Sequence, residues 1–113
     1  MEFCTKEHEA FFNDHKDISA RGHEYAALVY ALGINLECRE HFQRLYNDGI
    51  NPDALRDSWQ TGASRRITRL AFNLFTWDIA AGDDPTAYTP KELLSGLDDD
   101  QRRGAIAAIA LFA

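Results

Sequence analysis

Two pairs of cysteine and histidine residues are the part of this sequence best suited to bind a metal ion. Cys4 precedes His8 by four positions, and Cys38 precedes His41 by three. Residues three or four positions apart lie on the same face of a helix, so each pair would present one sulfur and one nitrogen in one direction. Thiolate and imidazole are the usual ligands of structural zinc. The spacing therefore predicts that these four side chains hold a structural Zn²⁺ between two helices.

Other interpretations of the same residues stay open. All six cysteine and histidine residues fall within the first 41 positions, so His15 or His23 could replace one of the four ligands. Cysteine is also among the residue types most often buried in a core, and Cys38 and His41 lie on an apolar helix stripe. Both pairs could therefore be packed core residues without a metal.

The case for an enzyme rests on one thiol. Cys38 falls in the first turn of an expected helix, where a thiolate would be stabilised, and His41 follows one turn later. A thiol enzyme also needs an exposed nucleophile and an oriented base, and the sequence contains no nucleophile elbow, phosphate-binding loop or dinucleotide-binding motif. We therefore expect a protein that is not an enzyme, and keep a metal- or thiol-dependent enzyme as the last alternative.

A basic segment near the middle of the chain could bind an anion. Three of the twelve basic residues fall within five positions of WQTGASRRITR, at an expected helix start. Cations there oppose the helix dipole, so an acidic group should compensate them. The compensation would come from Asp53 or Asp57, or from an external anion such as phosphate, which helix starts bind readily. The candidate anion-binding residues are Thr61, Gly62, Ser64, Arg65, Arg66 and Arg69.

The protein as a whole is acidic, with a formal net charge of −6 at pH 7. This charge disfavours direct binding to nucleic acid, because phosphates need a basic surface. It favours a partner protein with a basic groove. Two groups of acids are candidate partner-binding residues, although both could be solvated turns and helix caps. They are Asp83 and Asp84, and then Asp98, Asp99 and Asp100.

The sequence contains no stretch of about 18 apolar residues that could span a membrane. Its first residues, MEFCTKEHEAFF, carry acids where a signal peptide needs a basic start followed by an apolar stretch. We therefore expect a cytoplasmic protein. Thiols stay reduced in that compartment, so a disulfide between Cys4 and Cys38 is not expected.

Helix start signals recur along the chain, while the alternation typical of strands is nearly absent. A side chain that can accept a hydrogen bond from the first helical turn precedes five segments, and proline follows directly after two of these side chains. The predicted caps are Thr5, Asn35, Asn51, Thr89 and Asp98.

Apolar residues at helical spacing support the same elements. They mark segments 25–32, 38–45 and 67–75, and Gly33 would end the first of these. The last segment, AIAAIALFA, is small and apolar all round, so it should be buried between other helices. A chain of 113 residues has the size of one domain. We therefore predict an all-α fold, a single compact domain over residues 1–113 with five to seven helices stapled by zinc.

Four segments follow one another along nearly the whole chain: KEHEAFF, ALGINLECREHF, SWQTGASRRITRLAFNLF and YTPKELLSGL. Together they resemble a family of small uncharacterised bacterial proteins that is common in phages and other mobile elements. The likeness is most specific from Trp59 to Phe75. It departs at Ser58, where the family usually has glycine, at Ala63, in place of a serine, and at Arg66, in place of a lysine.

The resemblance adds to both the metal and the partner predictions. His8 and His41 match histidines of the family pattern, which would make both of them zinc ligands. Size, charge and phage setting are similar to those of anti-CRISPR proteins, which block a host nuclease by binding it. We therefore expect an inhibitor that binds a Cas effector in the cytoplasm of a bacterial host and blocks nucleic-acid loading or cleavage. The alternative is a small regulatory or anion-binding module that uses residues 64–69.

Overall fold

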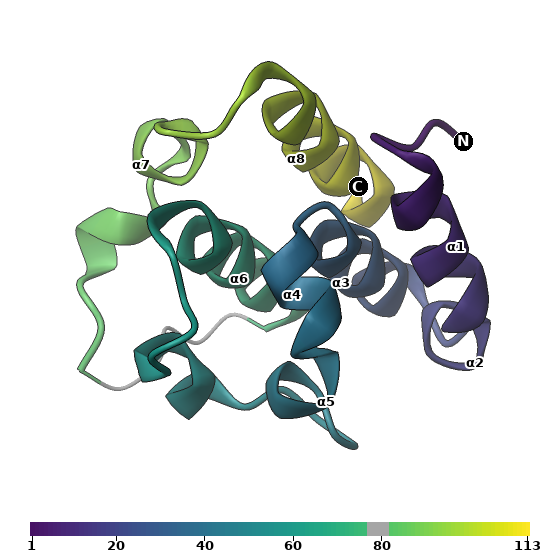
Figure 1. Cartoon of the computed structure of the whole chain (residues 1–113), viewed down its shortest axis with the longest axis horizontal. Helices are drawn as coiled ribbons and strands as arrows, with labels where there is room; N and C mark the ends of the chain where they lie inside the picture. The colour runs from purple at the N-terminus through teal and green to yellow at the C-terminus, as the bar shows by residue number, and fades with distance from the viewer. Residues whose placement is uncertain (77–81) are drawn as a thin grey trace.

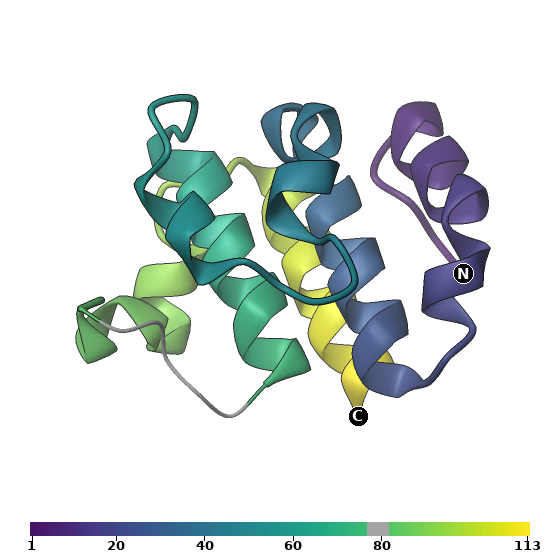
Figure 2. The same ribbon diagram turned by 90° about the horizontal axis from the view of Figure 1, so that it is seen from below.

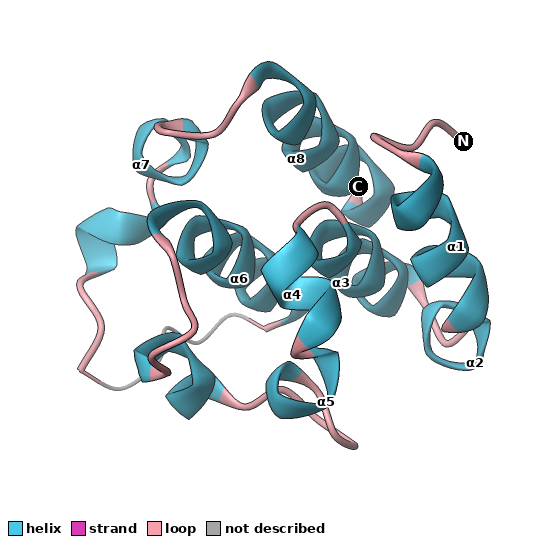
Figure 3. Cartoon of the chain, viewed as in Figure 1, coloured by secondary structure: helices cyan, strands magenta, loops and turns pink. Residues whose placement is uncertain are grey.

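The computed structural model describes residues 1–76 and 82–113. Within these ranges the chain forms eight α-helices and two short 3₁₀ helices, and no strand (Figure 1, Figure 3). The all-α prediction is confirmed, while the predicted number of helices is too low. The elements are α1 (Lys6–Asp14), α2 (Lys16–Ser19), α3 (His23–Gly33), α4 (Leu36–Glu40), α5 (Phe42–Leu45), η1 (Pro52–Arg56), α6 (Gly62–Phe75), η2 (Pro85–Tyr88), α7 (Pro90–Leu94) and α8 (Asp99–Phe112).

Two histidines explain part of the difference between the predicted and the observed number of helices. His15 separates α1 from α2, and His41 separates α4 from α5, which the sequence pattern predicts as one helix. The Nδ1 atom of each ring is hydrogen-bonded to the carbonyl oxygen four residues earlier, at 2.8 Å from Phe11 O and 2.9 Å from Glu37 O. Because each imidazole donates to a carbonyl of the last helical turn, it stabilises a helix end there. The chain then continues as a separate short helix.

Helix α3 forms the centre of the core and packs against α1, α2, α6 and α8. Figure 2 shows α1 on the outer side of α3, away from α6. Leu28, Val29 and Leu32 of the predicted stripe are completely buried, but so are Ala27 and Ala31. A helix enclosed on several sides buries its whole circumference, so the stripe underestimates how much of α3 is core.

Gly33 ends α3 as predicted, but the reason is space. A Cβ atom at this position would lie 2.8 Å from both His8 Cδ2 and Phe11 Cδ1. The missing side chain therefore lets α1 approach α3 closely. This approach places the His8 ring inside the core, where it is completely buried.

All five predicted caps are present. Each side chain accepts a hydrogen bond from a backbone N–H two or three residues later, which satisfies a donor that the first helical turn leaves unpaired. The five are Thr5, Asn35, Asn51, Thr89 and Asp98.

Helix α8 is not enclosed as the sequence predicts. Its inner side is packed so closely that a Cβ atom at Gly104 would lie 2.6 Å from Cys4 Sγ and 2.9 Å from Ile34 Cδ1. Its outer side carries Ile106 and Ile109, which are exposed. Figure 1 shows α8 along one edge of the molecule, so neighbouring helices cover only part of its circumference. Among the described residues, no helix combines the length and apolar character needed to cross a bilayer.

Candidate functional site

His8, a predicted zinc ligand, has both ring nitrogens in hydrogen bonds inside the protein. Its Nδ1 accepts the Cys4 N–H at 3.1 Å, and its Nε2 donates to Tyr30 O at 2.8 Å. The ring also packs edge-on against the rings of Phe3 and Tyr30. Burial lowers the pKa of His8, so the imidazole is neutral at pH 7. This arrangement leaves no ring lone pair for a metal ion.

The other three predicted ligands point to different partners. Cys4 Sγ donates to Asp100 O at 3.2 Å. Cys38 Sγ is buried, 3.5 Å from Thr68 Oγ1, and burial raises the pKa of this thiol to about 12. The His41 ring stacks on Trp59 with ring centres 4.1 Å apart.

The structure therefore gives no support to the predicted zinc staple. Across residues 1–76 and 82–113, no group of three or more His, Cys, Asp or Glu side chains is arranged to hold a metal ion. The possible substitutes do not change this, since His15 packs against Phe11 and Phe42 and His23 is exposed. Spacing along a helix predicts which way a side chain points, but not which helix lies opposite. The packed-core interpretation fits His8 and Cys38, whose polar atoms are paired with nearby protein atoms.

The predicted anion-binding donors at the start of α6 are engaged in a capping box. Thr61 Oγ1 accepts the Ser64 N–H at 3.0 Å, and Ser64 Oγ accepts the Thr61 N–H at 2.7 Å. Ser64 Oγ also donates to Gln60 Oε1 at 2.6 Å. Gly62 offers its carbonyl to Arg66 Nη1 at 3.1 Å. The polar groups of TGAS thus build the helix start and do not face an open anion site.

The arginines of α6 bind neighbouring segments of the chain. Arg69 forms two hydrogen bonds with Asp83, at 2.9 and 3.1 Å. Arg66 donates to Glu92 O at 3.1 Å, and its guanidinium lies 3.8 Å from the carboxylate of the same residue. Arg65 Nε donates to Leu55 O at 3.1 Å. The prediction that internal acids compensate these charges is confirmed for Arg66 and Arg69, but the acids, Glu92 and Asp83, are distant in sequence.

The two acids expected to compensate the arginines of α6 pair with other arginines. Asp57 forms two hydrogen bonds with Arg44 and accepts a third from Trp59 Nε1, and these bonds lower its pKa against the effect of burial. Asp53 lies 3.8 Å from Arg56. The prediction that they serve the α6 arginines is therefore wrong.

The candidate partner-binding acids lie at the starts of η2 and α8 and have mostly local roles. Asp84 caps η2 and Asp98 caps α8, while Asp83 is held by Arg69. Asp99 and Asp100 are exposed and pair with the arginines three positions later, Arg102 and Arg103. The turn-and-cap interpretation accounts for these contacts, and only Asp99 and Asp100 still present carboxylates outward on a long helix.

The feature that the sequence reasoning missed is the outer side of α8. Ile106, Ile109 and Phe112 remain 54%, 42% and 41% exposed, and they are three of the five large hydrophobic side chains exposed among the described residues. Ile106, Ile109 and Ala110 follow helical spacing, which could have revealed a second apolar stripe opposite the packed one. We call the residues Ile106, Ile109, Ala110 and Phe112 the α8 surface.

Two hollows flank the α8 surface. One has a volume of about 270 Å³, and the exposed Met1 belongs to it. The other, of about 230 Å³, lies where Phe112 meets the end of α6. The first is lined by Met1, Glu2, Tyr30, Ala107, Ala110 and Leu111, and the second by Asn73, Leu74, Phe75, Thr76 and Phe112. The exposed apolar area therefore continues from the helix into both neighbouring depressions.

Comparison with known proteins gives one match. Residues 1–107 match the model of a family described as "Family of unknown function (DUF6075)". Searches of curated proteins and of solved structures found no match. The phage setting and the likeness to anti-CRISPR proteins stay predictions. Because the match covers most of the sequence, the chain belongs to this family of unknown function.

Proposed function

We propose that this protein acts by binding another protein through the α8 surface. The observation that carries the proposal is the gathering of exposed Ile106, Ile109 and Phe112 on the last turns of one edge helix, with Met1 beside them. Contiguous apolar patches on a small protein usually mark a contact surface. Ile109 and Phe112 lie beyond the residues that match the family, so the proposal concerns this chain and not every member.

The energetics indicate how much of the surface a partner must cover. Full burial of Ile or Phe contributes about 1.5–3 kcal/mol, so covering the exposed half of each of the three side chains contributes about 1 kcal/mol apiece. A micromolar complex needs about 8 kcal/mol in total. The partner therefore also has to fill the hollows beside the helix.

The acidic charge of the protein indicates which residues its partner should carry. Asp99 and Asp100 are exposed at the start of α8, and exposed Glu2 lines one hollow together with Asp100. The chain carries a net charge of −6. A partner with basic residues around an apolar ridge complements this arrangement. A Cas effector nuclease is our finer proposal, because such enzymes hold nucleic acid in a basic channel that an acidic protein can occupy.

The double variant Ile106→Asp/Ile109→Asp is expected to keep its fold, since both side chains point outward, and to lose its partner. The measurement is chemical crosslinking in host cells that express the tagged full chain, followed by mass spectrometry of the crosslinked residues. Leu36→Asp is the matched control, because Leu36 is 55% exposed but lies on α4.

The proposal requires crosslinks from α8 to one protein in the wild type and in Leu36→Asp. In the double variant the yield of these crosslinks should fall at least tenfold. A tenfold loss of affinity corresponds to about 1.4 kcal/mol. Equal recovery from all three chains would contradict it. The proposal would also be contradicted if light scattering showed that the wild type is a dimer and the double variant a monomer. A second copy of the chain would then occupy the surface.

A cleavage assay tests the finer proposal separately. Wild-type protein at a concentration ten times its dissociation constant is expected to slow target cleavage by a purified Cas effector about tenfold, by mass action. The double variant is expected to leave cleavage unchanged. If neither protein affects cleavage by any effector that the host encodes, a Cas partner is rejected, while the crosslinking result still decides whether α8 binds a protein.

A further inference from the structure

We infer that the turn between α5 and η1 is a site of covalent modification, at which Asp48 isomerises to isoaspartate without the help of an enzyme. The inference is independent of the α8 surface and needs no partner protein. It starts from the Asp48–Gly49 peptide, in which an exposed aspartate precedes the one residue type that has no side chain. In Figure 1 the chain between α5 and η1 forms a loop at the lower edge of the molecule.

The reaction joins the side chain of Asp48 to the backbone nitrogen of Gly49. This nitrogen attacks the carboxyl carbon and forms a C–N bond, while the carboxyl OH leaves as water together with the amide hydrogen. The product is a cyclic imide, whose nitrogen is bonded to two carbonyl carbons. Water then breaks one of these two bonds. Breaking the side-chain bond restores aspartate, and breaking the main-chain bond gives isoaspartate, so the mass is unchanged and no oxidant or cofactor is needed.

The attacking nitrogen is free in the folded protein. None of the hydrogen bonds within residues 1–76 and 82–113 is donated by the Gly49 N–H. The turn is closed by other groups, among them the Asn47 N–H, which donates to Gly49 O at 2.9 Å. Apart from its chain neighbours, a Cβ atom at Gly49 would meet no atom within 4 Å. The nitrogen therefore lies beside open space, where a carboxyl group can approach it.

The Asp48 side chain is equally unrestrained. It is exposed, and its carboxylate forms no hydrogen bond or ion pair in the described part of the chain. Its backbone has φ 57°, in the left-handed region that L residues disfavour. Because the turn holds Asp48 in an unfavourable conformation, little stability is lost when the backbone rotates and brings the Gly49 nitrogen to the carboxyl carbon.

Three other exposed aspartates show why the fold favours the reaction at Asp48. Asp14, Asp17 and Asp53 are exposed, but in each case the N–H of the next residue already donates to a carbonyl oxygen. A nitrogen held in this way cannot turn toward the preceding carboxylate without breaking its hydrogen bond. The three donors are His15, Ile18 and Ala54, at 3.3, 3.0 and 3.1 Å from their acceptors.

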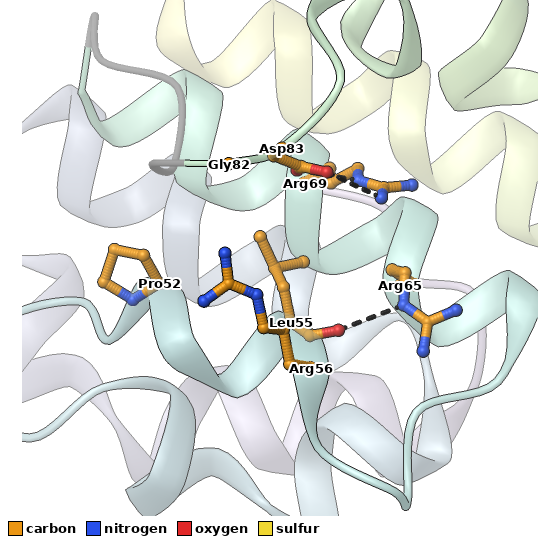
Figure 4. Close-up of a pocket in the computed structure, with 7 residues that line it drawn as sticks. All are labelled: Pro52, Leu55, Arg56, Arg65, Arg69, Gly82 and Asp83. Carbon is orange, nitrogen blue, oxygen red and sulfur yellow. Dashed lines mark hydrogen bonds and ion pairs between the residues drawn. The ribbon is translucent and has the colours of Figure 1, made fainter.

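The segments on both sides of the turn are well anchored, so the change stays local. Leu45 and Tyr46 before it are buried, and the Tyr46 hydroxyl accepts a hydrogen bond from Arg21 at 3.3 Å. After it, η1 is joined to α6 by the bond from Arg65 Nε to Leu55 O at 3.1 Å, drawn in Figure 4. Isomerisation adds a methylene group to the backbone between these anchors. It also leaves an exposed α-carboxylate that a carboxyl methyltransferase can methylate.

The test is storage of the folded full chain at neutral pH for several weeks, followed by trypsin digestion and mass spectrometry. Trypsin releases peptide 45–56, which contains both Asp48 and Asp53. We expect a second form of this peptide with the same mass and a different elution time, in which fragmentation locates the changed linkage at Asp48. Deamidation of an asparagine in the same peptide would raise the mass and is thereby distinguished.

Asp48→Glu is expected to abolish the second form, because the longer side chain would have to close a larger and less favourable ring. Asp53→Glu is the matched control, since it changes the other aspartate of the same peptide and should leave the amount of the second form unchanged. Storage in urea compares the folded with the unfolded chain. Asp48 should isomerise at a similar rate in both, whereas folding should slow the reaction at Asp53.

The inference is overturned if peptide 45–56 of the stored folded protein contains no isomer at Asp48. Equal isomerisation at Asp48 and Asp53 in the folded chain would also overturn it, because the free nitrogen of Gly49 would then have no effect. So would a reaction at Asp48 that folding slows as strongly as the reaction at Asp53. Because the comparison with urea uses the unchanged sequence, it does not depend on the folding of a variant.

Discussion

The His8→Ala variant is expected to be less stable than the wild type by about 3 kcal/mol, because it creates a cavity and leaves a buried carbonyl unpaired. The His8 ring is completely buried and connects the N-terminal segment, through the Cys4 N–H, with Tyr30 O of α3. Alanine removes both hydrogen bonds and the contacts with Phe3 and Tyr30. Urea denaturation of both proteins gives the difference in the free energy of unfolding.

His23→Ala is the matched control, since His23 is exposed at the start of α3 and should change the free energy by less than about 0.5 kcal/mol. Treatment with a chelator distinguishes a histidine held by hydrogen bonds from a histidine that binds zinc. It should leave the thermal midpoint of the wild type unchanged. One zinc per chain, removed together with several degrees of stability, would instead restore the metal interpretation of His8.

The effect of His8 should depend on pH in a defined direction. Burial lowers its pKa from the ordinary value of 6.5, so in the folded protein the ring stays neutral to a lower pH than in the unfolded chain. Between the two values the unfolded chain binds the extra proton, and stability falls as the pH falls. The difference between wild type and His8→Ala is therefore largest above pH 6.5 and decreases below it.

The Ser64→Ala variant is expected to lose about 2 kcal/mol, the cost of leaving buried polar groups without partners. Ser64 is completely buried, and its hydroxyl accepts the Thr61 N–H and donates to Gln60 Oε1. Gln60 is itself buried and donates to Thr68 Oγ1 at 3.2 Å, so the loss extends into a network beneath α6.

Urea denaturation and amide hydrogen exchange together test the Ser64 prediction. Amide exchange should accelerate in the first turn of α6, because the variant lacks the capping box there, and should not accelerate in α3. Ser58→Ala is the control, because Ser58 is an exposed serine of the same segment. A loss below about 0.5 kcal/mol for Ser64→Ala would mean that water replaces the hydroxyl without cost.

The helix starts could be predicted because their signals are local. A cap such as Asn35 or Thr89 binds a backbone N–H three residues later, so the residues needed for the prediction are adjacent in the sequence. The helical stripe of α3 is similarly local. Gly33 shows the limit, since its position marks the helix end but its reason, the approach of His8 and Phe11, belongs to another helix.

The candidate sites could not be predicted to the same degree because their partners are distant in the sequence. Arg69 pairs with Asp83, and Arg66 with Glu92, neither of which the local pattern points to. The exposed side of α8 depends on how many helices surround it. Composition alone predicts burial for AIAAIALFA, while its place at the edge of the fold leaves Ile106 and Ile109 uncovered.

The close contact at Gly104 means that the position of α8 depends on the absence of a side chain at this residue. Even one methyl group on this residue would meet Cys4 Sγ and Ile34 Cδ1, so these side chains or α8 itself would have to shift. If α8 binds a partner as we propose, a substitution on the hidden side of the helix would change the affinity without altering a residue that the partner touches.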